Sequence, residues 1–430
     1  MSNRAAEAGF LSKVHQKGFL HSYRILDLTD ERGLLCGKLL GDLGADVIKI
    51  ERPGGDEARD RGPFYQGVRG SERSLYWFSL NASKRGITLD ITKPEGRAIF
   101  RRLVERSDCV LESFHPGYLD RIGLGYRELC RVKADLIMTS ITAFGETGPY
   151  HEYKDSDLTL SALSGLLYIC GDPDRPPVRI SAEQSYFHSA ADGASGTVMA
   201  LYHRGVSGEG QHVHVSTLKA MERVAYTAYT LWDARRKILK RAGSSLRIPP
   251  LGTVTPLIWP CKDGYVAFYL FGGNMGAVSN PALTQWMAEE GLASDAMKAM
   301  DWPRFDIGRT PQEQIDREIV GPVSEFFRRH TQAELWDGGV ERRVMVYPVN
   351  DARGVLADPQ LSERAFWRQI EHPHLHKVFS YPGPFIKTEE GLCEVRGRAP
   401  MVGEHNEDIY GQELGISKED RTRLKAERII

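Results

Sequence analysis

The sequence lacks any run of apolar residues long enough to cross a membrane, for which about 18 or more would be needed. Residues 1–22 also lack the apolar stretch of a secretory signal peptide, and we expect them to form an arm outside the folded domains. No charge of one sign is in excess, because the formal net charge is −1. These absences favour a cytoplasmic protein with no nucleic-acid or membrane partner, in which any anionic ligand is held by local cations.

Paired cysteines are also absent. The 6 cysteines are scattered among apolar neighbours, and none forms a CxxC pair. We therefore expect buried free thiols and no disulfides. Three histidines, His372, His374 and His376, recur at strand spacing, which would place them on one face of an extended segment. A zinc site needs a fourth ligand, and we expect no metal.

The chain lacks the two common glycine-rich phosphate motifs, the P-loop and a GxGxxG that follows a strand. Nucleotide hydrolysis and NAD binding are therefore unsupported. What is present instead is an alternation of strand and helix patterns. Segments 23–28 and 46–51 read as strands around a helical segment at 34–45, which makes a βαβ unit. The alternation continues to about residue 141 and predicts an α/β fold with a parallel sheet.

The length of 430 residues predicts more than one domain. Helical patterns rich in small residues begin near residue 157, and one long helix is expected over 218–243. The composition then changes, and strand and helix patterns up to residue 343 predict a smaller α+β domain. The expected division is an arm at 1–22, a large α/β domain at 23–225, a linker helix and small domain at 226–343, and a segment at 344–430 that returns to the large domain.

Six motifs occur in order along nearly the whole chain: "LGADVIKIERPGGDEAR", "KRGITLDITKPEGR", "ESFHPGYLDRIGLGY", "LIMTSITAFGETGPY", "GEGQHVHVS" and "APMVGEHNEDIYGQELG". Together they resemble the class III CoA-transferases, the CaiB/BaiF family that includes formyl-CoA transferase. The resemblance implies a Rossmann-like large domain with a small second domain. It also implies two chains interlocked like links in a dimer.

The resemblance implies that CoA is a substrate, as coenzyme A or an acyl-CoA, and that no cofactor is tightly bound. Binding CoA requires cations that fork onto its phosphates and an apolar surface for its adenine. The positions that match the family's CoA-binding residues are Arg52, Leu89, Phe114, Arg121 and Lys154. Three further cations, Arg59, Lys84 and Arg85, are candidates for phosphate contacts.

Catalysis in the resembled family uses an aspartate whose carboxylate attacks the donor thioester and forms a mixed anhydride. The matching register of this chain reads Glu183, Gln184 and Ser185, with a shift of one or two residues possible, and it contains no aspartate. Asp192 and His188 lie further along the expected helix and read as structural residues. Asp157 matches the family's acidic position, which supports the site and is not the nucleophile.

Positions that would contact the acyl group also depart from the family pattern. Glu31 and Arg32 stand where the family has a short segment ending in "AGP", and Ser156 stands where transferases often have tyrosine. The loop Phe271–Gly276 is either the family's glycine-rich cover of the site or an ordinary turn.

Four functions remain open from these residues. The first is the CoA-binding subunit of a heteromeric transferase, paired with a homologous subunit that carries the aspartate. The second is a self-sufficient homodimeric CoA-transferase that uses Glu183 as a displaced nucleophile. The third is an acyl-CoA racemase, which is disfavoured because Ser156 stands where racemases have histidine. The fourth is a CoA-binding scaffold without turnover. The acyl donor and acceptor cannot be read from the sequence.

Overall fold

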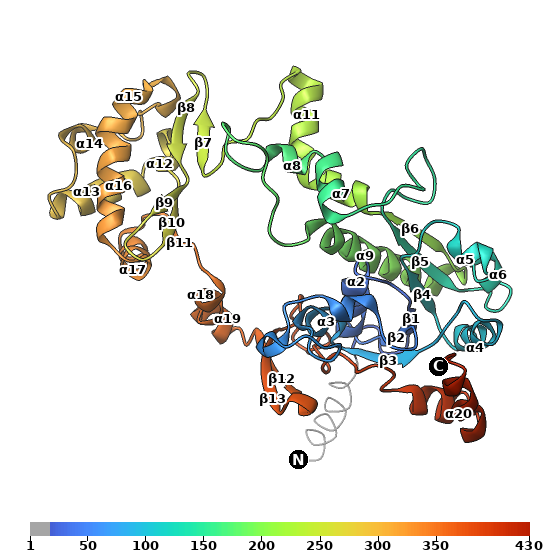
Figure 1. The fold of residues 1–430 in the computed structure, drawn as a ribbon. Coiled ribbons are helices and arrows are strands. Elements are labelled where there is room, and N and C mark those ends of the chain that lie inside the picture. The colour runs from blue at the N-terminus through green and yellow to red at the C-terminus, as the bar shows by residue number, and fades with distance from the viewer. Residues whose placement is uncertain (1–17) are drawn as a thin grey trace, which may run out of the picture. The chain divides into compact units, whose positions relative to one another are not determined.

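The computed structural model describes residues 18–430 (Figure 1). These residues form two compact units. The first contains the chain up to Leu166 together with Ile180–Thr230 and Gln360–Ile430, and the second contains Leu167–Arg179 and Leu231–Pro359. The division into domains at residues 226 and 344 stays a prediction. In the described part of the chain, no helix has the length and apolar character needed to cross a membrane.

A six-stranded sheet forms the centre of the first unit, and all of its strand pairs are parallel. The strand order β3-β2-β1-β4-β5-β6 reverses direction between β1 and β4, as in a doubly wound α/β fold. This confirms the predicted Rossmann-like α/β class. The strands are β1 (Arg24–Asp27), β2 (Asp46–Glu51), β3 (Lys84–Thr88), β4 (Cys109–Glu112), β5 (Ile137–Thr142) and β6 (His212–Ser216).

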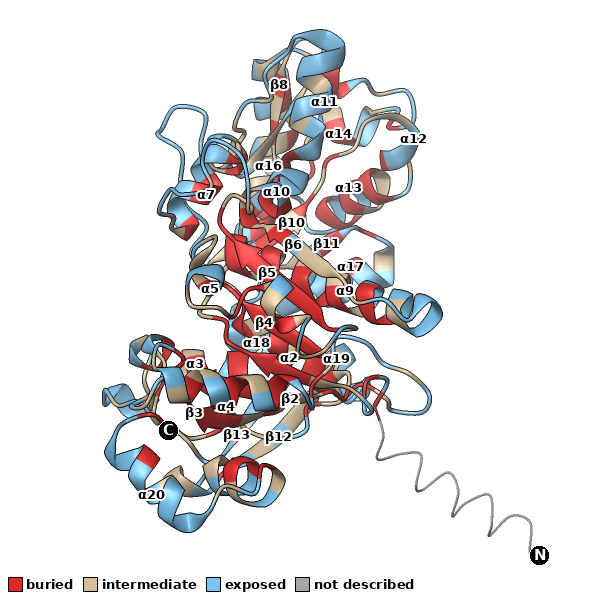
Figure 2. Cartoon of the chain, turned by 90° about the vertical axis from the view of Figure 1, so that its right-hand side faces the viewer, coloured by how far each residue is buried: buried red, intermediate tan, exposed pale blue. Residues whose placement is uncertain are grey.

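Helices cover both faces of this sheet, because its strands are apolar on both sides. Every residue of β4 and β5 is buried, as expected of a parallel sheet packed on two faces. In Figure 2, β4 and β5 are accordingly red, and the outer faces of the helices are pale blue. The helices of the unit include α2 (Leu34–Asp42), α3 (Leu75–Asn81), α4 (Pro94–Val104), α5 (Tyr118–Arg121), α6 (Tyr126–Leu129), α7 (Asp157–Leu163) and α9 (Gln184–Ser207).

The carboxyl-terminal segment of the first unit forms a hairpin and a final helix. Strands β12 (Trp367–His372) and β13 (Lys377–Pro382) pair antiparallel, and helix α20 (Lys418–Ala426) packs Leu424 into the core. The expectation that three histidines share one face of an extended strand is wrong. His372 ends β12, a helical turn holds His374, and His376 adopts a left-handed φ of 50° that turns the chain back.

The second unit is a smaller α+β assembly. Its antiparallel sheet contains β9 (Ile258–Pro260), β10 (Tyr265–Phe268) and β11 (Val346–Pro348). Trp259, Phe268 and Phe327 meet edge to face in its core. Its other elements include β7 (Ser245–Ile248), β8 (Thr253–Pro256), α12 (Gly273–Gly276), α13 (Ser279–Glu289), α14 (Asp295–Ala299), α15 (Gln312–Ile315), α16 (Gly321–Arg329), α17 (Gln332–Arg342) and α18 (Ala352–Leu356). The helices α8 (Leu166–Ile169) and α19 (Pro359–Glu363) span the positions in the sequence at which one unit ends and the other begins.

The expectation of one continuous helix over 218–243 is wrong. The segment contains α10 (Thr217–Glu222), a short 3-10 turn and α11 (Tyr226–Arg235). The helix ends where Arg236 adopts a left-handed φ of 53°. None of the residues of α11 is fully buried, so little packing supports an extension of the helix beyond Arg235.

Candidate functional site

Two loops meet at the carboxyl ends of β1 and β4, where the strand order reverses. The backbone N–H of Asp30 donates to the hydroxyl of Ser113 at 2.8 Å, and that hydroxyl donates to the Asp30 carboxylate at 2.8 Å. Ligands of doubly wound sheets bind outside the carboxyl ends of the strands at such a switch point. The catalytic and CoA-binding residues of the first unit are therefore expected around these loops.

Asp157 holds the amino end of α9. It lies at the start of α7, with Ser156 as the preceding cap residue, and it is buried. Its carboxylate accepts hydrogen bonds from the backbone N–H of Ser185 at 3.0 Å and from the Ser185 hydroxyl at 2.7 Å. The supporting role predicted for Asp157 stays a prediction, with Ser185 now identified as the residue that it holds.

Glu183 is held by two other side chains. It occupies the cap position before α9, but its side chain makes no cap hydrogen bond. One carboxylate oxygen pairs with the guanidinium of Arg61, and the other accepts a hydrogen bond from the Tyr76 hydroxyl at 3.2 Å. Burial and the neighbouring charge of Glu183 raise the pKa of Tyr76 above its usual range. Both oxygens of the candidate nucleophile are therefore engaged.

Arg32 joins a second ion-pair cluster at the same end of the sheet. Its guanidinium lies 2.5 Å from the Asp30 carboxylate and 3.1 Å from that of Asp155. Burial alone would lower the pKa of Arg32, but hydrogen bonding to Asp30 and the charges of both carboxylates raise it. Glu31, whose pKa is raised by burial and by the charge of Asp30, lies 3.6 Å from Arg61. Charged pairs therefore occupy the positions at which the family resemblance places acyl contacts.

The Arg61–Glu183 pair should contribute modestly to stability. Arg61 is about one third exposed, and solvent screening limits the coupling energy to about 1 kcal/mol. A double-mutant cycle with Arg61→Gln and Glu183→Gln, measured by urea unfolding, tests this value. The Arg223–Asp192 pair is a matched control, because its more exposed arginine should give a smaller coupling. Equal coupling in the two pairs would contradict the prediction.

The structure brings two of the predicted CoA-binding residues together. Phe114 and Tyr118 pack with ring centroids 4.9 Å apart, and the Arg121 guanidinium lies 5.9 Å from the Tyr118 ring. Lys154 is exposed in the loop after β5. These three predicted residues are accessible in whole or in part, and their contacts with CoA stay a prediction.

The other two predicted CoA-binding residues follow β2 and β3 at the same edge of the sheet. Arg52 is exposed and pairs with Glu57. Leu89 is buried in the core of the first unit, so its side chain is not accessible to an adenine in this structure. The predicted contact between Leu89 and the adenine of CoA stays a prediction.

Three further cations are already paired within the first unit. Arg59 and Lys84 are buried, paired with Glu51 and Asp27 respectively. Arg85 pairs with Asp46 and Glu413 at the opposite end of β3. Their contact with a phosphate stays a prediction, which these ion pairs disfavour.

The residues predicted to be structural in α9 have ordinary surroundings. Asp192 pairs with Arg223, and His188 is half-buried. The loop Phe271–Gly276 belongs to the second unit, where it contains the helical turn α12 instead of an irregular loop.

Sequence reasoning missed Glu112, a buried carboxyl at the end of β4. Burial raises its pKa to about 7, opposed by hydrogen bonds from Ser140 and from the backbone of Phe114. It borders a polar cavity of about 170 Å³ that Glu146 and His212 also line. The available signal was a carboxylate inside an otherwise apolar strand, just before the "SFHPG" loop.

Glu112 should make stability fall as the pH rises. Its folded pKa of about 7 lies above the ordinary value of 4.5, so the folded state retains a proton that the unfolded state loses between these values. The penalty is absent below about pH 4.5 and complete above about pH 7, where it reaches roughly 3 kcal/mol. Glu112→Gln should remove this slope in urea-unfolding measurements at pH 5 and pH 8, whereas Glu363→Gln, at an exposed position, should retain it. An unchanged slope in Glu112→Gln would contradict the assignment.

Comparison with known proteins identifies the family. The family model of CoA-transferase family III matches residues 20–406. The chain belongs to CoA-transferase family III. The class III resemblance of its six motifs is thereby confirmed, and members of such a family use CoA thioesters as substrates.

Relatives in family III align over nearly their whole length. The chain is 36% identical over 394 residues to the succinyl-CoA:(R)-benzylsuccinate CoA-transferase subunit BbsE of Thauera aromatica, covering 90% of this chain and 92% of that subunit. It is 32% identical over 416 residues to the succinyl-CoA–D-citramalate CoA-transferase of Chloroflexus aurantiacus, covering 96% of this chain and 98% of the relative.

Solved structures agree on the fold of family III. A CaiB/BaiF family protein from Brucella suis matches with a TM-score of 0.78 and 26% identity, over 92% of this chain and 99% of that one. The protein Rv3272 from Mycobacterium tuberculosis, in its orthorhombic form, matches with a TM-score of 0.68 at 22% identity, over 90% of this chain and 98% of that one, and this likeness concerns the fold alone.

Proposed function

We propose that this chain transfers CoA between an acyl-CoA thioester and a free carboxylic acid as the CoA-binding subunit of a heteromeric transferase. The single observation that carries the proposal is the state of the segment where the family's aspartate is expected. Within residues 183–185 no aspartate is present, Glu183 is tied to Arg61 and Tyr76, and Ser185 is tied to Asp157.

A carboxylate that attacks a thioester needs a free lone pair and a reacting distance of about 3–3.5 Å. Each Glu183 oxygen keeps a further lone pair, but the ion pair with Arg61 and the hydrogen bond from Tyr76 stabilise the carboxylate and so lower its nucleophilicity. Asp192 lies on a later turn of α9 and is paired with Arg223. The carboxylates of this segment are therefore poor nucleophiles as placed.

In the proposed assembly, the homologous subunit supplies the aspartate. Its carboxylate attacks the donor's carbonyl carbon, the C–S bond breaks, and CoA leaves as a thiolate. The thiolate then attacks the aspartyl carbonyl of the mixed anhydride, which releases the donor acid and leaves an aspartyl-CoA thioester. The acceptor acid reverses the two steps. This chain would contribute cations to the CoA phosphates through Arg52, Arg121 and Lys154.

The relatives suggest the substrate class. Their names pair succinyl-CoA with benzylsuccinate, D-citramalate, mesaconate and glutarate, which are all dicarboxylic acids. We propose succinyl-CoA as the donor and a dicarboxylic acid as the acceptor. The benzylsuccinate relative is named as a subunit, which supports a heteromer over a homodimer.

Purification from the native host tests the subunit assignment. A homologous chain that carries the aspartate should co-purify. The pair should form the acceptor's CoA thioester from succinyl-CoA, and mass spectrometry detects this product. Benzylsuccinate, citramalate, mesaconate and glutarate are the acceptors to assay. Full activity of this chain without a partner would overturn the heteromeric proposal and leave the family assignment intact.

Chemical trapping tests Glu183 as a displaced nucleophile. The isolated chain is incubated with succinyl-CoA and then with hydroxylamine or borohydride, and the peptide around residue 183 is examined by mass spectrometry. The proposal predicts an unmodified Glu183. A hydroxamate or a reduced side chain at this position would instead establish a self-sufficient enzyme.

A further inference from the structure

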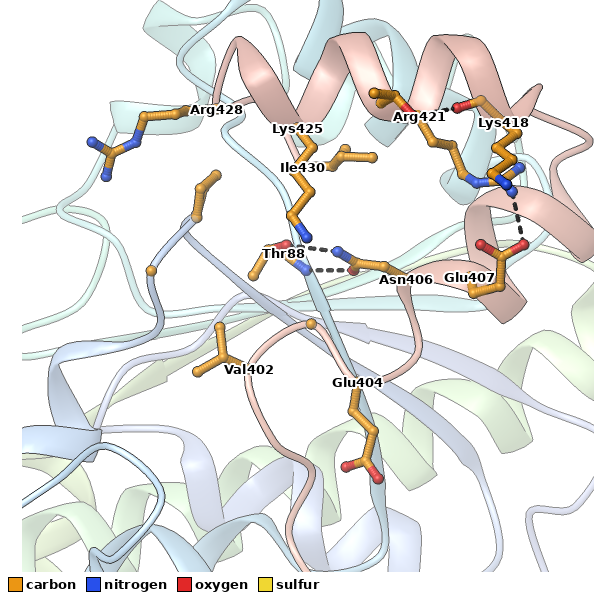
Figure 3. Close-up of a pocket in the computed structure, with 14 residues that line it drawn as sticks. Thr88, Val402, Glu404, Asn406, Glu407, Lys418, Arg421, Lys425, Arg428 and Ile430 are labelled. Carbon is orange, nitrogen blue, oxygen red and sulfur yellow. Dashed lines mark hydrogen bonds and ion pairs between the residues drawn. The ribbon is translucent and has the colours of Figure 1, made fainter.

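A buried carboxyl distinguishes one cavity of the first unit from another. The cavity beside α20 has a volume of about 610 Å³ (Figure 3), and its lining cations Lys418, Lys425 and Arg428 are exposed. A smaller cavity of about 170 Å³ lies beside β4, β5, β6, α5 and α6, and the buried Glu112 borders it. Exposed cations do not select one ligand, whereas a buried carboxyl requires hydrogen-bond partners from its neighbours. The smaller cavity therefore carries the more specific information.

A row of hydrogen bonds joins Glu112 to β5 and β6. Ser140 of β5 lies opposite Glu112 of β4 in the sheet register and donates a hydrogen bond to its carboxyl. The Ser140 hydroxyl also lies 2.8 Å from Nε2 of His212 in β6. Because a hydroxyl has only one proton, a Ser140 that donates to Glu112 must accept from His212. The row therefore has a direction, from His212 through Ser140 to Glu112.

His212 can donate to Ser140 as a neutral ring. Burial lowers the pKa of His212 to about 4, and the charge of His214 acts in the same direction. The His212 ring stacks on Tyr126, with ring centroids 4.9 Å apart, and its centroid lies 3.9 Å from that of His214. A neutral imidazole has one N–H and one unprotonated nitrogen. The hydrogen bond to Ser140 requires the tautomer with its proton on Nε2.

The Glu112 carboxyl also holds the loop that follows β4. Its Oε2 accepts a hydrogen bond from the backbone N–H of Phe114 at 2.8 Å. The Phe114 ring packs against Tyr118, and the Arg121 guanidinium lies 5.9 Å from the same Tyr118 ring. Phe114 and Arg121 are two of the predicted CoA contacts. The backbone position of a predicted ligand residue therefore depends on a side chain that lies beneath it.

The charge of Glu112 decides how firmly Phe114 is held. An ionised carboxylate accepts hydrogen bonds only, and a charged acceptor makes a bond roughly twice as strong as a neutral one. A protonated Glu112 would be a neutral acceptor for Phe114, and its own O–H would need an acceptor. Burial raises the pKa of Glu112 to about 7, although the hydrogen bonds from Ser140 and Phe114 oppose the shift. Both forms are therefore populated near neutral pH.

Other titratable groups face Glu112 from the elements packed around it. The charges of Glu146 and Asp30 act with burial to raise the pKa of Glu112. Burial and the charge of Asp120 also raise the pKa of Glu146, and the charges of His115 and His151 oppose this shift. Glu146 is therefore the control for titration of the cavity as a whole. The remaining titratable or charged groups of the lining are Tyr118, Tyr126, Arg127 and His212.

We infer that Glu112 is a positioning residue for CoA, whose ionised carboxylate, ordered by Ser140 and His212, fixes the Phe114 backbone so that the ring can contact the ligand. This inference rests on the proposed CoA-binding function. Glu112 acts through Phe114 and does not itself touch CoA. The affinity for CoA should then rise as Glu112 loses its proton, although the same ionisation lowers the stability of the fold.

Isothermal titration calorimetry with CoA at pH 6, 7 and 8 tests this role. The protein is the full chain with any subunit that co-purifies, and any CoA site on that subunit is the same in every sample. Glu112→Gln keeps a neutral acceptor at every pH. The affinity of the wild type relative to this variant should rise from about twofold at pH 6 to about tenfold at pH 8. The ratio cancels the titration of the CoA phosphates, because both proteins bind the same ligand.

Ser140→Ala supplies a readout that a merely structural role would not move. The substitution removes the hydrogen bond that stabilises the ionised form of Glu112. The midpoint of the pH profile of CoA affinity should therefore move upward from about pH 7. Glu146→Gln is the matched control. It removes another carboxylate from the same cavity, and the rise in affinity with pH should remain, with its midpoint slightly lower. Unfolding curves show whether each variant keeps the fold.

The outcomes separate the inference from the proposed function. An affinity ratio between wild type and Glu112→Gln that stays constant from pH 6 to pH 8 overturns the positioning role and leaves CoA binding intact. Loss of the rise in Glu146→Gln would assign the titration to Glu146 and overturn the role of Glu112. Should Glu112→Gln fail to fold, an unmoved midpoint in Ser140→Ala overturns the inference. If no CoA binds at any of these pH values, the proposed function fails as well.

Discussion

Glu183→Gln in the assembled transferase should leave the turnover number within about threefold of the wild-type value, because a residue outside the reaction contributes no transition-state stabilisation. The corresponding change in the partner, from the nucleophilic aspartate to asparagine, should lower turnover by about four orders of magnitude or more. The physical reason is that the asparagine amide cannot form the mixed anhydride that the aspartate carboxylate forms. Glu183 is bound by Arg61 and Tyr76.

Steady-state assays with succinyl-CoA and the best acceptor measure this difference. The variant complexes must first show the same subunit ratio and unfolding temperature as the wild type. Arg61→Gln is an informative companion, because it releases Glu183 from its ion pair. If Glu183→Gln abolished turnover while Arg61→Gln raised it, Glu183 would be the nucleophile, and the chain would be catalytic in its own right.

Much of the fold could be predicted from local patterns. Strand patterns at 23–28 and 46–51 predicted β1 and β2, and the helical pattern at 34–45 predicted α2. These elements could be predicted because the apolar residues of each one, at strand or helix spacing, mark the side that must be buried. The prediction of one long helix over 218–243 was wrong, because the segment has no such pattern of buried residues: α11 buries none of its side chains.

The candidate site was less predictable, because ion pairing depends on which strands become neighbours. Lys84 and Arg59 were candidates for phosphate contacts. In the folded chain Lys84 of β3 pairs with the buried Asp27, and Arg59, in a 3-10 turn after β2, pairs with the buried Glu51. The binding of Glu183 by Arg61 joins residues far apart in sequence. Family motifs located residues 183–185 in the sequence, but only the folded chain showed that Arg61 and Asp157 contact them.

The buried pair of Asp27 and Lys84 should be the most sensitive ion pair to substitution in the described chain. Both side chains are fully buried, and the Lys84 ammonium donates to Asp27 at 2.8 Å, to the Leu34 carbonyl at 2.8 Å and to Asn81 at 2.9 Å. Burial lowers the pKa of Lys84 even though Asp27 opposes the shift. The pair lies beneath Gly37, where any Cβ would collide with the Asp27 carboxylate.

Asp27→Asn should therefore reduce the free energy of unfolding by about 3–5 kcal/mol, because it leaves a buried ammonium without its counter-charge. Lys84→Met should cost a similar amount, since Asp27 then faces only Lys49 and the hydrogen bonds from Thr29. The double variant Asp27→Asn/Lys84→Met keeps an acceptor for Thr29 and buries no unpaired charge. Its loss should fall short of the sum of the single losses by about 2 kcal/mol or more.

Urea unfolding of the single and double variants measures this coupling. Arg85→Gln serves as the reference, because Arg85 is partly exposed at the end of the same strand and should cost about 1 kcal/mol or less. Additive losses in the double variant would contradict a specific role for the pair. A coupling of the expected size would mean that the lysine of "KRGITLD" serves folding, because all three of its hydrogen bonds are made to buried groups of β1, α2 and α3.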